Sequence, residues 1–157
     1  MRDCLRPHRN LAAETQLKIM IQKIQSLMYQ SENHSTVEKM LENASKLVKT
    51  PNRVLDLEVI EHYEGWTDLD GLVGELTMEV PVVADISKED LQEIVQEMRG
   101  VIESGQAPEP MSLDYWMNFY REFFALNFPG AEDELYDAVF EDIELDEVVE
   151  MALPHIR

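Results

Sequence analysis

The chain has 157 residues, of which 45% are hydrophobic, and a formal net charge of −19 from 32 acidic and 13 basic residues. This apolar content argues against an intrinsically disordered chain and is enough for a buried core. The negative charge argues against direct binding to nucleic acid or to an anionic membrane, so we expect any partner that it attracts to be a basic protein.

The charge is unevenly distributed along the chain. Residues 1–53 hold nine Lys or Arg and five Asp or Glu, a balance of +4, whereas residues 54–157 hold four and 27, a balance of −23. A charge this far from zero costs stability through self-repulsion. Such an asymmetry indicates either an interaction surface or docking of the basic half onto the acidic remainder.

Cysteine content and hydropathy favour a cytoplasmic protein. The single cysteine, Cys4, cannot form an internal disulfide, and this favours a reducing compartment. No apolar run in the sequence reaches the length of a membrane span. Residues 1–10 lack the apolar region of a secretory signal, and we expect them to form a flexible N-terminal arm.

Apolar residues recur at spacings of three and four through most of the chain, which predicts an all-α fold. We expect a single-domain multi-helix bundle of about seven helices over residues 11–157. Residues 11–50 should form a helical hairpin whose first helix carries an apolar stripe along residues 17–28. The stripe fits a core, and it is also long enough to form the seam of a homodimer.

Residues 51–105 are predicted to form the middle helices. Thr50 and Pro51 have the pattern of a helix start, with Thr as the cap and Pro in the first turn. As an alternative, the alternation of apolar and polar residues near 54–60 and 80–86 fits a small two-stranded β element. The capping signals favour the helical interpretation.

Further capping signals mark the later helix ends. The pairs Thr67–Asp70 and Ser87–Asp90 each resemble a capping box, and Gly105 fits a C-terminal cap. Residues 106–111 contain two prolines and are predicted to be a linker. The aromatic helix and the acidic C-terminal helices follow over residues 112–157.

The aromatic helix holds seven of the twelve aromatic residues, all within residues 115–128. The simplest explanation is a central helix buried by its neighbours, because these residues surround most of the helix. The alternative is an exposed anchor patch that contacts a partner through Tyr115, Trp116 and Tyr120.

Residues 132–150 contain ten carboxylates and no basic residue, in one kinked helix or two short ones. On a continuous helix, five of these carboxylates would share a stripe roughly 20 Å long, a loose imitation of a phosphate backbone. A solvated outer face is the ordinary interpretation, and a partner-binding acidic face is the functional one. The five predicted partner-binding carboxylates are Glu134, Asp137, Glu141, Glu144 and Glu147.

No motif in the sequence indicates a catalytic, metal or cofactor site. Residues 142–153 begin like a calcium loop but place Glu147 where glycine is needed and Leu153 where the bidentate Glu belongs. Four scattered histidines form no zinc set or triad, and the six glycines form no phosphate-binding loop. We therefore predict no catalytic residue, no metal and no cofactor. An enzyme with an unrecognised carboxylate site is the remaining alternative.

These features favour a small acidic helical binding protein that inhibits or neutralises a basic partner, such as a nucleic-acid-acting enzyme or a toxin. Immunity proteins, phage-encoded inhibitors and DNA mimics share this size and charge, which is an analogy only. The alternative is a non-catalytic helical scaffold or regulatory adaptor that self-associates through residues 17–28.

Overall fold

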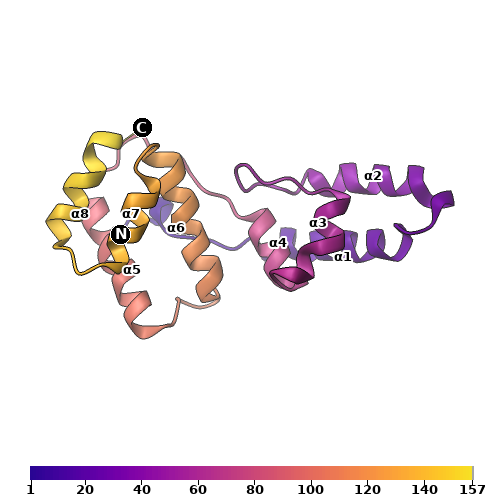
Figure 1. The fold of residues 1–157 in the computed structure, drawn as a ribbon, viewed down its shortest axis with the longest axis horizontal. Helices are drawn as coiled ribbons and strands as arrows, with labels where there is room; N and C mark the ends of the chain where they lie inside the picture. The colour runs from indigo at the N-terminus through magenta and orange to yellow at the C-terminus, as the bar shows by residue number, and fades with distance from the viewer. Residues whose placement is uncertain (157) are drawn as a thin grey trace. The chain divides into compact units, whose positions relative to one another are not determined.

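The computed structural model describes residues 1–156 and confirms the predicted all-α class (Figure 1). These residues form no strand, so the alternative β element near 54–60 and 80–86 is wrong. They form eight α-helices, one more than about seven, because the acidic stretch is divided between two. The α-helices are α1 (Leu11–Leu27), α2 (His34–Ser45), α3 (Leu57–His62), α4 (Leu69–Thr77), α5 (Lys88–Ser104), α6 (Leu113–Asn127), α7 (Glu132–Phe140) and α8 (Leu145–Ala152).

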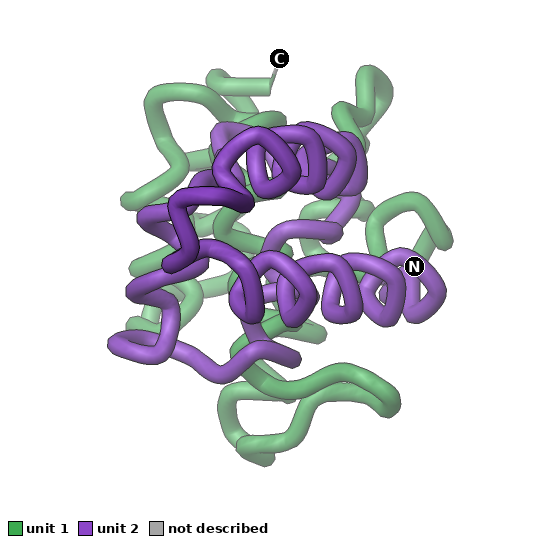
Figure 2. Tube along the Cα trace, turned by 90° about the vertical axis from the view of Figure 1, so that its right-hand side faces the viewer, with its two compact units in different colours: residues 1–7, 80–157 green, residues 8–79 purple. Residues whose placement is uncertain are grey.

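The helices belong to two compact units, which Figure 2 shows in different colours. Unit 2 is His8–Glu79 and contains α1 to α4, and unit 1 is Met1–Pro7 with Val80–Arg157 and contains α5 to α8. The chain passes from unit 1 to unit 2 after Pro7 and returns after Glu79. That residues 11–157 behave as one domain stays a prediction.

Unit 2 is built on α1, and the buried side of α1 follows the predicted stripe. Leu17, Ile21 and Ile24 have no exposed surface. α2 and α4 both pack against α1, and Figure 1 shows α1 and α2 side by side. Burial of each Leu or Ile side chain contributes roughly 1.5–3 kcal/mol. The other buried members of this core are Val37, Ala44, Leu55, Ile60, Tyr63, Leu72, Val73 and Leu76.

The predicted helix start at Thr50 and Pro51 is wrong. Thr50 is buried, and its hydroxyl lies within hydrogen-bond distance of the carbonyl oxygens of Glu75 and, at 3.0 Å, Met78. The hydroxyl is thus directed as a donor to the end of α4, and Asn52, two residues later, has φ of 60° in the left-handed region, so no helix begins after Thr50. α3 instead begins after Asp56, whose carboxylate accepts a 2.8 Å hydrogen bond from the Val59 N–H.

The other predicted caps agree more closely with the structure. The Ser87–Asp90 capping box is present, and Gly105 ends α5 with φ of 68°. At α4, however, the cap is Asp68 rather than Thr67, since the Asp68 carboxylate accepts the Gly71 N–H at 2.7 Å. These caps depend on residues within four positions of one another, so the sequence alone indicates them.

The core of unit 1 consists mainly of the aromatic side of α6. Its rings make edge, tilted and stacked contacts in a continuous series; for example, the centroids of Trp116 and Tyr120 are 4.8 Å apart. α7 packs against α6, and α5 packs against α7 and α8. The prediction of a central buried helix therefore describes α6 correctly. Its fully buried aromatic residues and the ring just beyond them are Trp116, Phe119, Tyr120, Phe123, Phe124 and Phe128.

The segment before α5 is held by α6 rather than by a strand partner. Asn127 is buried, its side-chain oxygen accepts the Val83 N–H at 2.8 Å, and its side-chain nitrogen donates to the Pro81 carbonyl at 3.0 Å. These bonds satisfy backbone groups that a β ladder would otherwise use. This explains why the β-branched residues of 80–86 do not form a strand.

The first seven residues are packed, in contrast to the flexible arm predicted for residues 1–10. Leu5 has no exposed surface, and its carbonyl accepts the Tyr120 hydroxyl at 3.0 Å. The Arg2 guanidinium donates to Asp90 at 2.7 Å and also contacts Asp85, and Arg6 pairs with Glu97. Basic residues of the N-terminal segment thus neutralise part of α5.

We expect Asn127→Ala to lower the free energy of unfolding by about 1–3 kcal/mol, because the buried Val83 N–H loses its acceptor. Urea denaturation measures this change. Asn43→Ala is the control, since Asn43 is exposed on α2 and should have little effect. Equal stability of Asn127→Ala and the parent protein would contradict the role given to this side chain.

The stability contributed by Asp90 should depend on pH. Burial acts to raise the pKa of Asp90, but hydrogen bonds from Ser87 and Arg2 outweigh it and hold the pKa below its ordinary value. A carboxylate with a lowered pKa stabilises the fold above its unfolded pKa, and the contribution is lost as pH falls through the folded value.

Asp90→Asn should therefore cost about 1–2 kcal/mol at neutral pH, and less as the pH falls from about 5 to 3. Denaturation midpoints over this range measure the difference. Asp114→Asn is the control, because Asp114 is an exposed acid in the first turn of α6. A difference between Asp90→Asn and the parent protein that stayed constant with pH would exclude this contribution.

Candidate partner-binding surface

The acidic stretch of residues 132–150 forms α7, α8 and the turn between them. Helical structure ends at Phe140 and resumes at Leu145, and Glu141 and Glu144 have extended backbone dihedral angles at the two helix ends. The prediction allowed one kinked helix or two short ones, and the structure has two. The continuous stripe of five carboxylates is therefore not formed, and neither is its imitation of a phosphate backbone.

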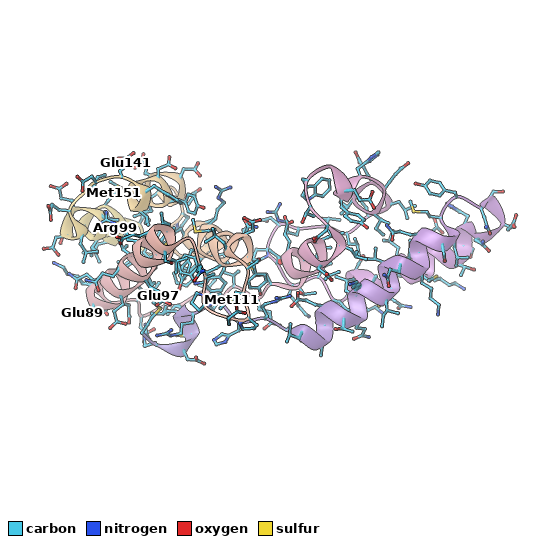
Figure 3. The ribbon with its side chains drawn as sticks, turned by 90° about the horizontal axis from the view of Figure 1, so that it is seen from below. Glu89, Glu97, Arg99, Met111, Glu141 and Met151 are labelled. Carbon is cyan, nitrogen blue, oxygen red and sulfur yellow. The ribbon has the colours of Figure 1, made fainter. Side chains whose placement is uncertain are left out.

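Arg99 of α5 holds the turn between α7 and α8. Its Nη2 donates to the Ile143 carbonyl oxygen at 2.6 Å, and its Nε donates to that of Val139 at 3.3 Å. Nη2 also lies 3.4 Å from the carbonyl oxygens of Ala138 and Glu141, but it has only two hydrogens, so the short bond to Ile143 is the strong one. Figure 3 shows Arg99 on the side of α5 that faces α7 and α8, with Glu141 at the outer edge.

The five predicted carboxylates lie on the outside of unit 1. Each of the five residues is exposed, and none pairs with a cation among residues 1–156. Three other acids of the stretch do have partners, since Glu150 lies 3.6 Å from Lys88, Asp146 accepts from Gln92 at 3.0 Å, and Glu132 accepts the Gly130 N–H at 2.6 Å. We call the exposed carboxylates of α7, α8 and their turn the acidic surface.

Helix electrostatics explain only part of the acidic surface. Acids in the first turn of a helix are stabilised by the helix dipole, and this applies to residues 132–134 in α7 and to 146–147 in α8. Glu141 and Asp142 follow the C-terminal end of α7, where a carboxylate is unfavourable. The helix dipoles therefore explain why the first-turn positions are acidic, but they do not explain Glu141 and Asp142.

About three quarters of the chain's excess charge, 14 of 19 negative charges, belongs to unit 1. Its residues include six basic and 20 acidic side chains, a balance of −14, whereas unit 2 has seven and 12, a balance of −5. The asymmetry between the two halves of the sequence is thus weaker between the folded units, because unit 2 is itself acidic and Arg2 and Arg6 of the basic half belong to unit 1.

The three predicted aromatic contacts are in the interior. Trp116 and Tyr120 have no exposed surface and Tyr115 is 8% exposed, so the structure does not place them beside the acidic surface as anchors. Burial, together with the nearby charge of Glu97, raises the pKa of Tyr120 above its ordinary value. Within residues 1–156, the buried Trp116 Nε1 has no hydrogen-bond partner.

The apolar stripe of residues 17–28 is also used inside the molecule. Leu17, Ile21 and Ile24 are fully buried in unit 2, and Met20, Leu27 and Met28 pack against the same core. A homodimer through this stripe would require unit 2 to open. The structure therefore offers no free face for the predicted seam.

Among residues 1–156, no group of three or more His, Cys, Asp or Glu is arranged to hold a metal ion. None of the helices in this range combines the length and apolar character needed to cross a bilayer. Cys4 is exposed and unpaired by any disulfide.

Reasoning from the sequence overlooked Arg99. Its signal was present, since Arg99 is the only basic residue between Lys88 and Arg121 in a strongly acidic region. Isolated cations of this kind are usually surface residues, and only the packing of α5 against the α7–α8 turn reveals its contacts.

Comparison of the chain with protein-family models, with curated proteins and with solved structures yields no match.

Replacement of Arg99 should loosen the α7–α8 turn. Arg99→Met keeps the aliphatic stem but loses a charged donor to a backbone carbonyl, which contributes about 1.5–3 kcal/mol. We expect faster amide hydrogen exchange in residues 138–145 and a lower free energy of unfolding. Arg99→Lys keeps the charge but lacks the planar set of donors, so it should restore only part of the loss. Full restoration by Lys would show that charge alone holds the turn.

Proposed function

We propose that the protein is a non-catalytic binding protein whose acidic surface binds a basic protein and neutralises or inhibits it. A nucleic-acid-acting enzyme or a toxin is the kind of target that presents enough positive charge. The observation that carries the proposal is the set of exposed carboxylates that pair with no cation within residues 1–156, including Glu141 and Asp142 at positions that oppose the dipole of α7.

The electrostatic self-repulsion of unit 1 supports this proposal. The excess of 14 negative charges in unit 1 is self-repulsive, and unit 2 folds with an excess of only five. A basic partner would relieve the repulsion when it binds, and the unscreened field would speed its approach. Exposed aromatic anchors are not part of this proposal, because the predicted ones are buried.

The rigid placement of the carboxylates also favours binding over simple solubility. α7 and α8 present apolar faces to the interior through buried residues such as Leu135, Val139 and Val149, and Arg99 holds the turn between them. Charges held on such a scaffold cost less conformational entropy on binding than charges on a flexible tail.

Binding should fall with salt and with loss of charge from the acidic surface. The Debye length shortens from about 10 Å at 0.1 M salt to about 3 Å at 1 M. Basic proteins retained by the immobilised chain at about 0.05 M salt should therefore be released at about 0.5 M. Mass spectrometry of the retained proteins from a cell extract identifies them and their charge.

A matched pair of variants separates local from global charge. The test variant is Glu134→Gln/Asp137→Asn/Glu141→Gln/Glu144→Gln, and the control neutralises four exposed acids of unit 2, Glu32, Glu42, Glu58 and Glu64. Each variant loses four negative charges. At roughly 0.5 kcal/mol per exposed charge, the test variant should bind the retained protein about 30-fold more weakly. Equal weakening by both variants would assign the effect to net charge and remove the acidic surface from the mechanism.

A further inference from the structure

A hollow of about 310 Å³ lies between the C-terminal part of α5 and the end of α7. We call it the α5–α7 hollow. Its apolar lining comes from Ile102, Val139 and Phe140, and its acidic lining from Glu103, Glu141 and Asp142. This volume is at the low end for ligand pockets, which suits a single long side chain better than a folded segment.

The electrostatics of the α5–α7 hollow favour a cation. Both α5 and α7 end beside it, and the C-terminal end of a helix carries partial negative charge. Glu103 in the last turn of α5 and Glu141 and Asp142 after α7 add full negative charges to these same ends. Three acids that oppose helix dipoles therefore line one hollow, and a bound cation would compensate all of them.

Arg99 also lines the α5–α7 hollow, but its positive charge does not cancel the preference of the hollow for a cation. Its Nε and Nη2 are directed to backbone carbonyls of residues 138–143 rather than to the three carboxylates. With one guanidinium against three carboxylates, the lining has an excess of two negative charges. The carboxylates are thus available to donors from outside the chain.

Phe140 provides a flat apolar surface at the opening. Half of the surface of Phe140 is exposed to solvent (50%), although the centroid of its ring lies 5.2 Å from that of Tyr136. A guanidinium group stacks on an aromatic ring and pairs with carboxylates at the same time, which an ammonium group does less well. The nearby Arg121, 4.6 Å from the Tyr136 ring centroid, shows that a guanidinium already lies over an aromatic ring of α7.

We propose that the α5–α7 hollow binds an arginine side chain of the basic partner, with the aliphatic stem on Ile102 and Val139 and the guanidinium between Phe140 and the carboxylates. This inference rests on the proposed function and specifies which group of the partner is recognised. It makes the acidic surface a source of attraction and the α5–α7 hollow the point of specific contact.

Titration of the ¹⁵N-labelled full chain with N-acetyl-arginine-N-methylamide tests the proposal. We expect amide shifts concentrated in residues 99–103 and 139–142, and binding at least about tenfold weaker for the citrulline analogue, which has the same shape without the charge. The lysine analogue should bind several-fold more weakly than arginine. Equal binding of citrulline or lysine, or shifts spread over all of α7 and α8, would overturn the proposal.

Variants of the lining give a second measurement. Glu103→Gln/Asp142→Asn and, separately, Phe140→Leu should each weaken binding of the arginine probe at least about fivefold. Glu134→Gln/Asp137→Asn is the control, because it removes two exposed carboxylates of α7 outside the hollow and should leave probe binding nearly unchanged. Equal losses in test and control would overturn the proposal, and the amide spectrum of each variant verifies that it is folded.

Failure of this inference and failure of the proposed function give different results. Suppose that basic proteins bind the parent chain and bind the four-residue variant of the acidic surface more weakly, but that the probe shifts no amide of the α5–α7 hollow. In that case only the inference fails. If the probe occupies the α5–α7 hollow while basic proteins bind the parent chain and that variant equally, the proposed function fails.

Discussion

Unit 1 depends on a small number of positive charges, because its six basic residues face 20 acidic ones. Each of the five in the described range has a structural contact. Arg2 and Arg6 hold the N-terminal segment on α5, Lys88 pairs with Glu150, Arg99 holds the α7–α8 turn, and Arg121 covers the Tyr136 ring. Within residues 1–156, the only ion pair of the acidic surface is that of Glu150 with Lys88, because the other cations are used where helices and segments must be joined.

The fold could be predicted wherever the decisive contacts are local. A capping box spans four residues, so Ser87 and Asp90 identify the start of α5 without knowledge of the rest of the molecule. Thr50 has an equally suitable sequence, but its hydroxyl donates toward carbonyls 25 and 28 residues away, and the next α-helix begins only at Leu57. Asn127 likewise decides the backbone conformation near Val83 from 44 residues away. Sequence patterns do not encode such long-range competition.

The candidate surface likewise has some features that local sequence predicts and others that depend on distant contacts. Exposure of the five carboxylates follows from their alternation with buried residues such as Leu135 and Val148, and this was visible in the sequence. The break between α7 and α8 depends on carbonyls held by Arg99, which is 40 or more residues earlier in the chain for Val139 and Ile143. The same break brings Glu141 and Asp142 to the end of α5. A tertiary contact therefore created the hollow and removed the stripe.

The contrast between the two units bears on why the charge is retained. Unit 2 buries an aliphatic core and pairs acids with bases, as in Lys18–Asp70 and Arg53–Glu75, so a helical unit of similar construction folds without a large excess of charge. The excess in unit 1 is therefore not a requirement of helix packing. A ligand that binds only the folded state raises stability, by about 2.7 kcal/mol at 100 times its dissociation constant. A cationic partner would supply such stabilisation at the positions where the carboxylates oppose the helix dipoles. The carboxylates that destabilise the free protein are therefore the ones that would bind the partner.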